Sequence, residues 1–340
     1  MPSVFLDHLT QKFLPAIEDE LHIAFERLND HGINKLYHML AYHMGWVGDG
    51  AGPDAQGKRI RPLLVLLTCA AGGGNWQNAL PAAASVELVH NFSLIHDDIE
   101  DHSPLRRGRP TVWEKWGIPQ AINTGDAMFT LAHLESLRLA ETVSPEVALQ
   151  AAKIIQQTCL HLTQGQFLDL YYETKHDVTI DDYWLMVEGK TAALLSSCTE
   201  LGALAASCDD ITRQYYRNFG RVIGLAFQVQ DDWLGIWGDS ALTGKSSDSD
   251  LVTGKKTLPV LYGLSQHKAF AARWIKGPIL PDQTKEMAML LESEGVKHYM
   301  QSQADMLINT ALESLDAAKP DVTAGDALKT LAIGLIGREV

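Results

Sequence analysis

The chain has 340 residues, with 28 Lys or Arg, 42 Asp or Glu and a formal net charge of −14. This acidic balance argues against a nucleic-acid-binding protein, because phosphate backbones are bound by an excess of basic residues. Hydrophobic residues make up 46% of the chain, enough for a large core, and no linker-like or repeated segment divides the sequence. We therefore expect one domain over residues 1–340.

Apolar residues recur at helical spacing along most of the chain, and alternating β-branched runs are nearly absent. The periodic segments are residues 8–29, 62–71, 79–96, 121–142, 145–163, 191–206, 214–231 and 258–264. Ser144 and Pro145 are typical of a helix start in which the Ser144 side chain is the cap. These patterns predict an all-α fold of about ten to fourteen helices.

No apolar run reaches the roughly 18 residues of a membrane-spanning helix, and the N-terminal segment is amphipathic and acidic, unlike a signal or transit peptide. The cysteines show no metal-ligand spacing and are Cys69, Cys159, Cys198 and Cys208. We expect reduced, mostly buried thiols in a cytoplasmic protein without a transmembrane segment.

Basic side chains first gather in the segment GKRIRP, which begins at residue 57. Lys58 and Arg61 are three residues apart, so helical spacing predicts that they share a helix face. Pro62 is tolerated only near a helix start, and a helix N-terminus favours an anion. Further along, His90 falls on the same helical stripe as Asp97 and is either a core histidine or a substrate contact.

The strongest chemical signal is the sequence LIHDDIEDHSPLRRG at residues 94–108. Asp97 and Asp101 would lie one turn apart on one helix face. Oxygen-only ligands suit Mg²⁺, which binds through one or two carboxylates plus substrate phosphates. Arg106 and Arg107 follow, and a guanidinium group matches phosphate oxygens. A solvated acidic turn is the alternative, but the apolar residues before the acids favour a metal and diphosphate site.

A second acidic pair, Asp231 and Asp232, follows a nearly continuous apolar segment at residues 222–229. Two buried acidic patches facing one cavity would repel each other without cations, so we expect metal ions there. Two unrelated exposed turns are the alternative. Gln228, one helical turn earlier, lies among apolar residues and needs a hydrogen-bond partner.

Three later segments add polar groups. Lys190 and Thr191 offer an ammonium and a hydroxyl group ahead of an apolar helix. In TQGQFLDL, Gly165 would let two helices, or a helix and a ligand, approach closely. Lys245 and Lys255 belong to a Gly- and Ser-rich loop that we expect to act as a lid. This loop lacks P-loop spacing and follows no strand, which excludes a P-loop nucleotide fold.

Together these segments resemble the trans-isoprenyl diphosphate synthases, also called polyprenyl synthetases. GKRIRP, ELVHNFSLIHDDIEDHSPLRRGRPTVW, NTGDAMF, TQGQFLDL, GKTAALL, AFQVQDDWLGIWGD and GKKTLP occur in that family's order and at its spacing. The resemblance implies the isoprenoid synthase fold, a single large all-α domain with helices packed around a deep central cavity. It also implies a homodimer and two Asp-rich motifs that face each other across the cavity mouth.

The resemblance also implies roles for individual residues. The implied cofactor is Mg²⁺, about three ions per active site. Metal ligands would come from Asp97, Asp98, Asp101, Asp231 and Asp232, with Asp97, Asp101 and Asp231 as the direct ligands. The allylic diphosphate would be held by Arg106, Lys190, Lys245 and Lys255. Isopentenyl diphosphate would be held by Lys58, Arg61, His90 and Arg107. Thr191 and Gln228 would flank the reacting carbons, and Phe227 would also contact substrate.

The implied reaction is a head-to-tail trans condensation of isopentenyl diphosphate with dimethylallyl, geranyl or farnesyl diphosphate. Metal ions and cationic side chains stabilise the departing diphosphate, so the allylic C–O bond ionises. The isopentenyl double bond then attacks the carbocation, and a proton is lost to the released diphosphate. The residues expected to act in catalysis are Asp97, Asp101, Arg106, Lys190, Thr191, Gln228, Asp231 and Lys245.

The chain departs from the family pattern in the second motif. That motif is typically DDxxD, but here Gly235 takes the place of the last acid. Because glycine cannot bind a metal ion, we expect metal binding that is retained but weakened. Asp239 is a candidate substitute by its proximity in sequence.

Product length depends on bulk near the first motif. Phe92 stands five residues before Asp97, and the resemblance implies a C20 product, geranylgeranyl diphosphate, when a single aromatic occupies that position. On an ideal helix, at about 100° per residue, Phe92 points roughly 140° away from Asp97, and Ser93 is nearer that face. Phe92 is therefore either the floor of the cavity or an ordinary core residue, and C15 or C25 products remain open.

Two other functions are open to such a chain. A class I terpene cyclase also ionises allylic diphosphates, but it does not need the cations Lys58, Arg61 and Arg107. A non-catalytic subunit that tunes an active partner should have lost metal ligands, whereas only the last acid of the second motif is missing here.

Overall fold

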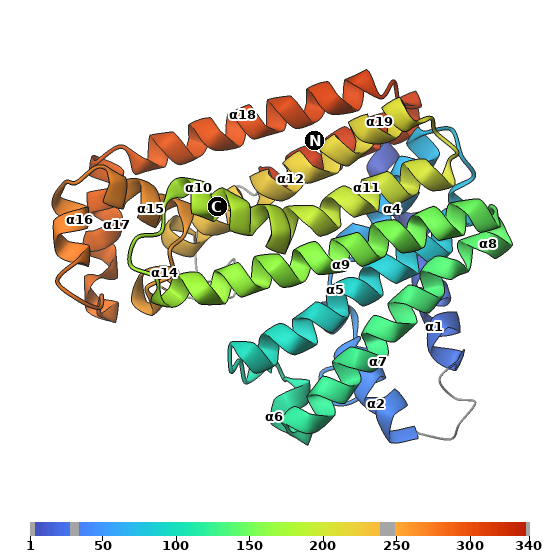
Figure 1. The fold of residues 1–340 in the computed structure, drawn as a ribbon, viewed down its shortest axis with the longest axis horizontal. Helices are drawn as coiled ribbons and strands as arrows, with labels where there is room; N and C mark the ends of the chain where they lie inside the picture. Colours follow the sequence, from blue (N-terminus) through green and yellow to red (C-terminus); the bar gives the residue numbers. More distant parts are fainter. Residues whose placement is uncertain (1–3, 28–33, 239–248, 338–340) are drawn as a thin grey trace. The chain divides into compact units, whose positions relative to one another are not determined.

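The computed structural model describes residues 4–27, 34–238 and 249–337 (Figure 1). The α-helices of eight or more residues are α1 (Val4–Glu26), α2 (Asn34–His43), α4 (Ile60–Ala71), α5 (Leu80–Glu100), α7 (Ile118–Leu137), α9 (Pro145–Thr174), α10 (Ile180–Val187), α11 (Ala193–Ala205), α12 (Asp210–Trp237), α15 (Leu258–Ser265), α17 (Thr284–Ser293), α18 (Val296–Ala317) and α19 (Val322–Ile336). The shorter ones are α3 (Pro53–Gln56), α6 (Val112–Trp116), α8 (Leu139–Thr142), α14 (Ser249–Thr253) and α16 (Ala269–Trp274). Two 3₁₀ turns, Trp76–Ala79 and Pro281–Gln283, and a π-helical segment, Glu188–Ala192, complete the helical structure of the described residues.

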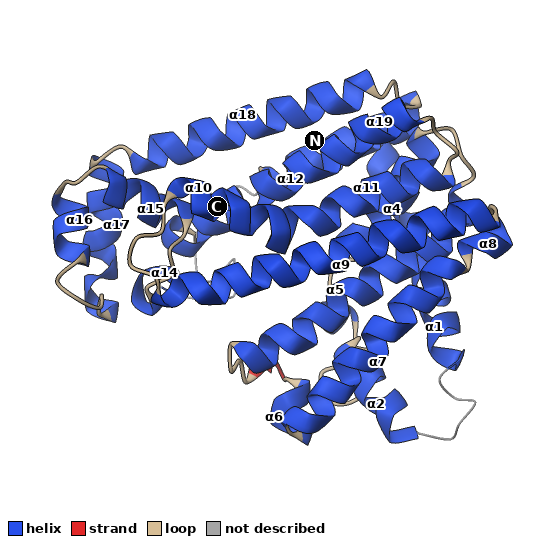
Figure 2. Ribbon diagram, in the orientation of Figure 1, coloured by secondary structure: helices blue, strands red, loops and turns tan. Residues whose placement is uncertain are grey.

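The prediction of an all-α fold is confirmed (Figure 2). In the described part of the chain, the strands are limited to a hairpin of β1 (Leu105–Arg106) and β2 (Arg109–Pro110). The expected ten to fourteen helices were too few, because the count did not include the short helices. The predicted segments also ended at residue 264 and therefore left out α16, α17, α18 and α19. In α18 the buried face includes Ala304, Ala311 and Ser314, small or polar residues that weaken the apolar periodicity.

Contacts within the described residues group the chain into two compact units. Unit 1 comprises residues 1–159, 197–217 and 318–328, and unit 2 comprises residues 160–196, 218–317 and 329–340. The expectation of a single domain over residues 1–340 stays a prediction.

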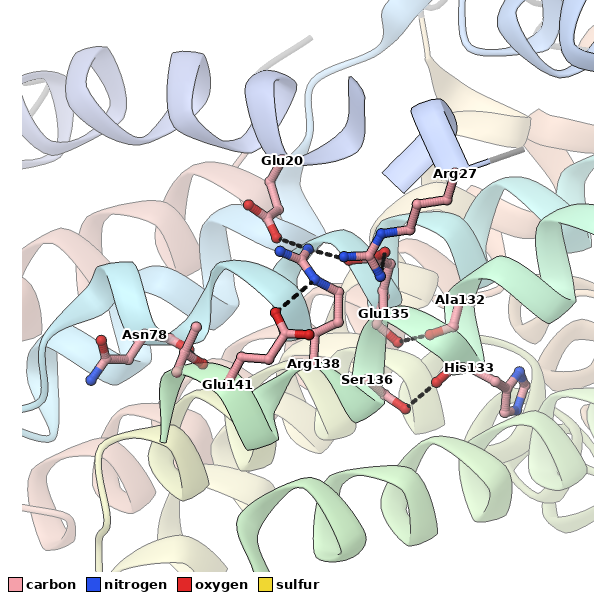
Figure 3. A network of polar contacts seen from close by, with 11 residues as sticks. Glu20, Arg27, Asn78, Ala132, His133, Glu135, Ser136, Arg138 and Glu141 are labelled. Atoms are coloured by element: carbon pink, nitrogen blue, oxygen red, sulfur yellow. Dashed lines mark hydrogen bonds and ion pairs between the residues drawn. The ribbon is translucent and has the colours of Figure 1, made fainter. Parts of the chain in front are cut away.

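In unit 1, α5 and α7 lie side by side (Figure 1). An ion-pair network joins α1 to the C-terminal end of α7 (Figure 3). Arg138 pairs with Glu20 of α1 and, at 2.7 Å, with Glu135 of α7, and Arg27 lies 3.4 Å from Glu135. Burial raises the pKa of Glu135, while Arg138 opposes that shift. Because removing one partner of a buried ion pair leaves an uncompensated charge, this network fixes α1 against α7.

The start of α9 agrees with its prediction. Pro145 is its first residue, and the Val147 amide donates a hydrogen bond to the Ser144 hydroxyl at 3.3 Å. This bond satisfies one of the amides that have no partner within the helix. The helix runs to Thr174, eleven residues beyond its predicted end at residue 163.

Replacing Ser144 by Ala is expected to lower the free energy of unfolding by about 1 kcal/mol, because an amide of the first turn loses its acceptor. Urea unfolding would measure the difference. Ser144→Asp, which keeps an acceptor at the cap, is the matched control and should unfold close to the wild type. Equal losses in both variants would contradict a capping role.

No described helix is long and apolar enough to cross a membrane. The thiols are not joined in disulfides: Cys69, Cys159 and Cys198 are buried and Cys208 is partly buried. Burial raises the pKa of the first three thiols to about 12. The prediction of free, mostly buried cysteines is confirmed.

Candidate active site

The first Asp-rich motif lies at the C-terminal end of α5 in unit 1. Asp97 is half-buried in the last turn, and Asp101 is the exposed C-cap residue. The Asp101 amide donates to the Asp97 carbonyl at 2.8 Å, which extends the helical hydrogen bonding and keeps the two residues one turn apart. This part of the prediction is confirmed, and it gives two carboxylates on one side of the helix end.

Asp98, between them, has a different environment. The residue is 1% exposed, and the Arg106 Nε donates to both carboxylate oxygens at 2.9 and 3.0 Å. Burial raises the pKa of Asp98, and the Arg106 guanidinium acts against this rise. The Asp98 carboxylate therefore holds Arg106 at the β1–β2 hairpin, while Asp97 and Asp101 lie toward solvent.

The basic segment before α4 differs from its prediction. The helix begins at Ile60, so Lys58 precedes it and does not share a helix face with Arg61. Arg59 has a left-handed backbone (φ 50°) and is buried, donating to Glu18 at 2.6 Å and to Glu87 at 2.8 Å. This buried ion cluster turns the chain into α4 and leaves Lys58 exposed and Arg61 in the first turn.

Several cationic side chains of unit 1 gather near His90 of α5. Burial lowers the pKa of His90 well below its usual value, and the positive charges of Arg61, Arg107 and Arg106 lower it further. Like charges held close together are costly without an anion. The structure therefore brings together Arg61, His90 and Arg107, as the sequence indicated for a diphosphate socket.

His43, at the end of α2, belongs to the same group and was missed by the sequence argument. Burial, followed by Arg106 and Arg107, lowers its pKa to about 3. The imidazole is therefore neutral at pH 7, and its Nε2 atom is buried without a hydrogen-bond partner among the described residues. A pocket beside it is lined by Tyr42, His43, Ala55, Asp98, Arg106, Arg107, Arg109, Pro110, Thr111 and Val112.

In unit 2, α9 contacts the π-helical segment at a glycine pair. A Cβ atom on Gly165 would stand 2.1 Å from the Lys190 amide nitrogen, and one on Gly189 would stand 2.8 Å from the Gly165 Cα. The sequence predicted that Gly165 allows a close approach, and this is confirmed for a neighbouring helix. π-Helical turns often occur at functional sites, and this one carries Lys190 and Thr191.

Both predicted residues of the π-helical segment have partners in unit 2. Lys190 pairs with Asp169 of α9. The Thr191 hydroxyl donates to the Gln228 Oε1 at 2.8 Å, and the Gln228 Nε2 donates to the Asp232 Oδ1 at 2.9 Å. The side-chain oxygen and nitrogen of Gln228 therefore each have the polar partner that the sequence led us to expect.

Asp232 repeats the pattern of Asp98. It is 3% exposed, and its Oδ2 atom accepts hydrogen bonds from the Tyr183 hydroxyl at 2.8 Å and the Leu258 amide at 2.9 Å. Burial raises the pKa of Asp232 to about 7, although these hydrogen bonds and the Gln228 amide oppose the rise. Asp231, one residue earlier, is exposed, and α12 continues to Trp237, six residues beyond the predicted helix end.

The predicted lid is described only in part. Lys245 and Asp239 lie outside the described residues, whereas Lys255 is exposed after the short helix α14. The Lys256 ammonium donates to the Tyr172 and Glu173 carbonyls at 2.7 and 3.0 Å. These carbonyls belong to the last turn of α9 and have no partner within the helix. Lys256 therefore fixes the C-terminal end of the predicted lid segment against α9.

The two chain-length candidates occupy neighbouring positions of α5. The Phe92 ring packs edge-on against Phe129 of α7 at 4.9 Å and against His96 at 5.8 Å. The Ser93 hydroxyl donates to the His90 carbonyl at 2.8 Å. Phe227, the remaining substrate candidate, is half-buried on α12 of unit 2.

Among the described residues, no group of three or more Asp, Glu, His or Cys side chains is placed to hold a metal ion by itself. This fits a cation that completes its coordination with water and substrate phosphates, as Mg²⁺ commonly does. Asp169, Tyr183 and Glu87 also position the candidate residues and were not singled out from the sequence. Their partners are distant in sequence; Glu87 and Asp169 lay in segments that carried a signal, ELVHNF and TQGQFLDL, whereas Tyr183 did not.

Comparison with known proteins agrees with this arrangement. The polyprenyl synthetase family model matches residues 52–290. The geranylgeranyl diphosphate synthase of Mycobacterium tuberculosis is 40% identical over 89% of this chain and 87% of its own. The (2E,6E)-farnesyl diphosphate synthase of Mycobacterium bovis is 36% identical over 99% of this chain and 97% of its own. A polyprenyl synthetase structure from Streptomyces coelicolor A3(2) superposes with a TM-score of 0.87 and 33% identity, covering 97% of this chain and 99% of that one.

The fold and the match over most of the chain define an all-helical enzyme of the isoprenoid synthase type. The chain belongs to the polyprenyl synthetase family. It is a polyprenyl diphosphate synthase, a trans-prenyltransferase that lengthens prenyl chains.

Proposed function

We propose that this enzyme condenses isopentenyl diphosphate with dimethylallyl, geranyl or farnesyl diphosphate in the presence of Mg²⁺, and that its main product is C20 geranylgeranyl diphosphate. The observation that carries the substrate assignment is the cationic group formed by Arg61 and Arg107 beside the neutral His90, in a chain of net charge −14. A diphosphate anion offsets the repulsion within this group.

Isopentenyl diphosphate is the substrate that this cationic group would bind. Arg61 and Arg107 offer guanidinium forks that match diphosphate oxygens, and Lys58 is exposed three residues before Arg61 in sequence. His90 is neutral at pH 7, because burial and the guanidiniums depress its pKa, and it donates one N–H to the anion. A terpene cyclase has no need of this second diphosphate socket, which favours chain elongation.

The carboxylates of the two Asp-rich motifs fit Mg²⁺. Asp97, Asp101 and Asp231 are the proposed ligands, with oxygen donors suited to a hard cation. Asp98 and Asp232 were also expected among the ligands; we assign them to positioning Arg106 and Gln228 instead. When bound, Mg²⁺ supplies the charge that stabilises the departing diphosphate, and about three ions per site remain our expectation.

The protein's own groups complete the proposed mechanism. Lys190, Arg106, Lys255 and Lys245 add positive charge for the allylic diphosphate, and Lys190 would exchange Asp169 for phosphate oxygens. The Thr191 hydroxyl and the Gln228 amide are held in one orientation by the chain that ends at Asp232. Fixed dipoles of this kind stabilise a nearby carbocation without reorganising. Phe227 would add apolar surface beside the prenyl chain.

The test of this function is product analysis. Purified protein would be incubated with Mg²⁺, isopentenyl diphosphate and each allylic starter, and the dephosphorylated alcohols would be sized. A dominant C20 alcohol supports the proposal, whereas C15 or C25 keeps the reaction and changes the product. Cyclic hydrocarbon from one allylic substrate would identify a cyclase. Absence of turnover by folded protein would favour a non-catalytic subunit.

Replacing Phe92 by Ala is expected to shift the main product upward by at least one C5 unit, because the variant removes the proposed floor of the chain-binding cavity. Product sizing with farnesyl diphosphate would detect the shift. The exposed Phe5 of α1 gives the matched control, and Phe5→Ala should leave product length unchanged. An unchanged C20 product from Phe92→Ala would assign Phe92 to packing against Phe129 alone.

The implied homodimer belongs to the same proposal. We expect an apparent mass close to twice 37.4 kDa in light scattering. A monomeric mass for active protein would remove the dimer from the proposal without affecting the reaction.

A further inference from the structure

The second Asp-rich motif contains a space that another carboxylate enters. Gly235 is the residue one helical turn after Asp231 on α12. A Cβ atom on Gly235 would stand 2.0 Å from the Asp250 Oδ2 and 3.0 Å from its Cγ. A side chain at position 235 would require the Asp250 carboxylate to move away. The absence of a side chain at position 235 is thus matched by a carboxylate from α14.

The helix geometry places this carboxylate close to Asp231. Residues four apart lie on one face of a helix, with Cβ atoms about 5–6 Å apart. Gly235 lies on the same face of α12 as Asp231, and the Asp250 carboxylate lies beside Gly235. Asp231 is exposed, whereas Asp232 is buried and bonded to Gln228, Tyr183 and Leu258. Asp231 and Asp250 are thus two carboxylates near one turn of α12.

The segment that carries Asp250 is fixed on its C-terminal side. Leu251, the next residue, is 1% exposed, and the Lys255 amide donates to the Asp250 carbonyl at 3.0 Å. Lys256 is bonded to the carbonyls at the end of α9. The Asp250 carboxylate therefore approaches Gly235 from an anchored position.

We propose that Asp250 supplies the carboxylate that position 235 lacks, and that it binds Mg²⁺ together with Asp231. This inference rests on the proposed Mg²⁺-dependent function. Mg²⁺ takes one or two carboxylates plus substrate phosphates, so Asp231, Asp250 and a diphosphate form a sufficient set of oxygen ligands. The expectation of weakened metal binding is then replaced by binding through a carboxylate from another helix.

The test measures metal binding separately from turnover. The Mg²⁺ dependence of the melting temperature would be recorded with saturating inorganic diphosphate, for wild type and for Asp250→Asn. Asn keeps the volume of Asp, so folding without ligand should be unchanged. The Mg²⁺ concentration for half-maximal stabilisation should rise about 10–100-fold, the range found when groups that support a metal site are removed. The control is Asp282→Asn, which removes an exposed acid of unit 2 and should match wild type.

Moving the carboxylate makes the test sharper. Gly235→Asp alone should lower the urea midpoint, because its side chain would displace the Asp250 carboxylate and place a like charge beside it. Asp250→Gly alone should weaken Mg²⁺ binding as Asp250→Asn does. The double variant, Gly235→Asp with Asp250→Gly, should recover both the urea midpoint and the Mg²⁺ requirement of wild type.

Two results would overturn the inference. One is wild-type Mg²⁺ dependence in both Asp250→Asn and Asp250→Gly, which would leave Asp250 a purely structural residue of α14. The other is a stable double variant that binds Mg²⁺ no better than Asp250→Gly. Failure of the proposed function is a separate outcome, since it would appear as absent prenyl transfer by the wild-type enzyme.

Discussion

Replacing Asp101 by Asn is expected to lower kcat by about 10²–10³-fold, the loss typical when one group that stabilises developing charge is removed. Asp101 is exposed at the end of α5 and lies one turn from Asp97. Its proposed task is to bind Mg²⁺, and Asn keeps its shape but removes its charge. The free energy of unfolding should change by less than about 0.5 kcal/mol, as for most surface positions. Initial rates of prenyl transfer and urea unfolding would measure the two quantities.

Asp98→Asn is the matched variant in the same turn and should behave in the opposite way. Its carboxylate is buried and accepts hydrogen bonds from Arg106, so loss of its charge should cost about 1.5–3 kcal/mol of stability. Added Mg²⁺ should not restore the lost stability, because Asp98 is proposed to hold Arg106 and not the metal ion. Normal stability of Asp98→Asn together with lost activity would show instead that Asp98 is a metal ligand.

The sequence was sufficient to predict which segments carry the chemistry, and the resemblance implied Asp97, Asp101 and Asp231 as direct ligands, but local periodicity did not show which acid of each pair is buried. In each Asp-Asp pair, adjacent side chains point about 100° apart on a helix, so one faces the core and the other does not. Which one faces inward depends on Arg106 for the first pair and on Tyr183 and Leu258 for the second. These partners come from other elements and leave no mark in local periodicity.

The start of α4 shows the same limit. GKRIRP predicts basic residues near a helix start, and this is correct, but Lys58 lies before the helix. The reason is Arg59, whose left-handed backbone is stabilised by pairing with Glu18 and Glu87, 41 and 28 residues away in sequence. The departure at Gly235 was visible in the sequence, whereas the approach of Asp250 required the structure. Polar pairs between residues distant in sequence therefore account for most of the differences between the sequence-based predictions and the structure.

Replacing Gly165 by Ala is expected to destabilise the protein, because Gly165 is in close contact with the π-helical segment. The added Cβ would stand 2.1 Å from the Lys190 nitrogen and 2.5 Å from the Gly189 carbonyl carbon, both backbone atoms that cannot rotate away. The α9 helix and the π-helical segment must move apart. Such overpacking costs about 1–3 kcal/mol.

The matched control is Gly334→Ala on α19, also in unit 2. A Cβ at Gly334 meets no atom within 4 Å. Since Ala is favoured over Gly in a helix interior, this variant should gain roughly 0.5–1 kcal/mol. Chemical unfolding of both variants would show whether the loss at Gly165 comes from the close contact or from adding a methyl group to a helix.

Activity separates a structural contact from one that positions the reacting groups. Lys190 and Thr191 lie in the segment that Gly165→Ala displaces, and Thr191 is hydrogen-bonded to Gln228. A shift of about 1 Å in such groups can cost about 10²-fold in rate, so kcat should fall at a temperature where the variant is fully folded. KM for isopentenyl diphosphate should change little, because its proposed socket is built from other residues, Arg61, His90 and Arg107. A variant that loses stability but keeps wild-type kcat would show that the π-helical segment does not position the reaction.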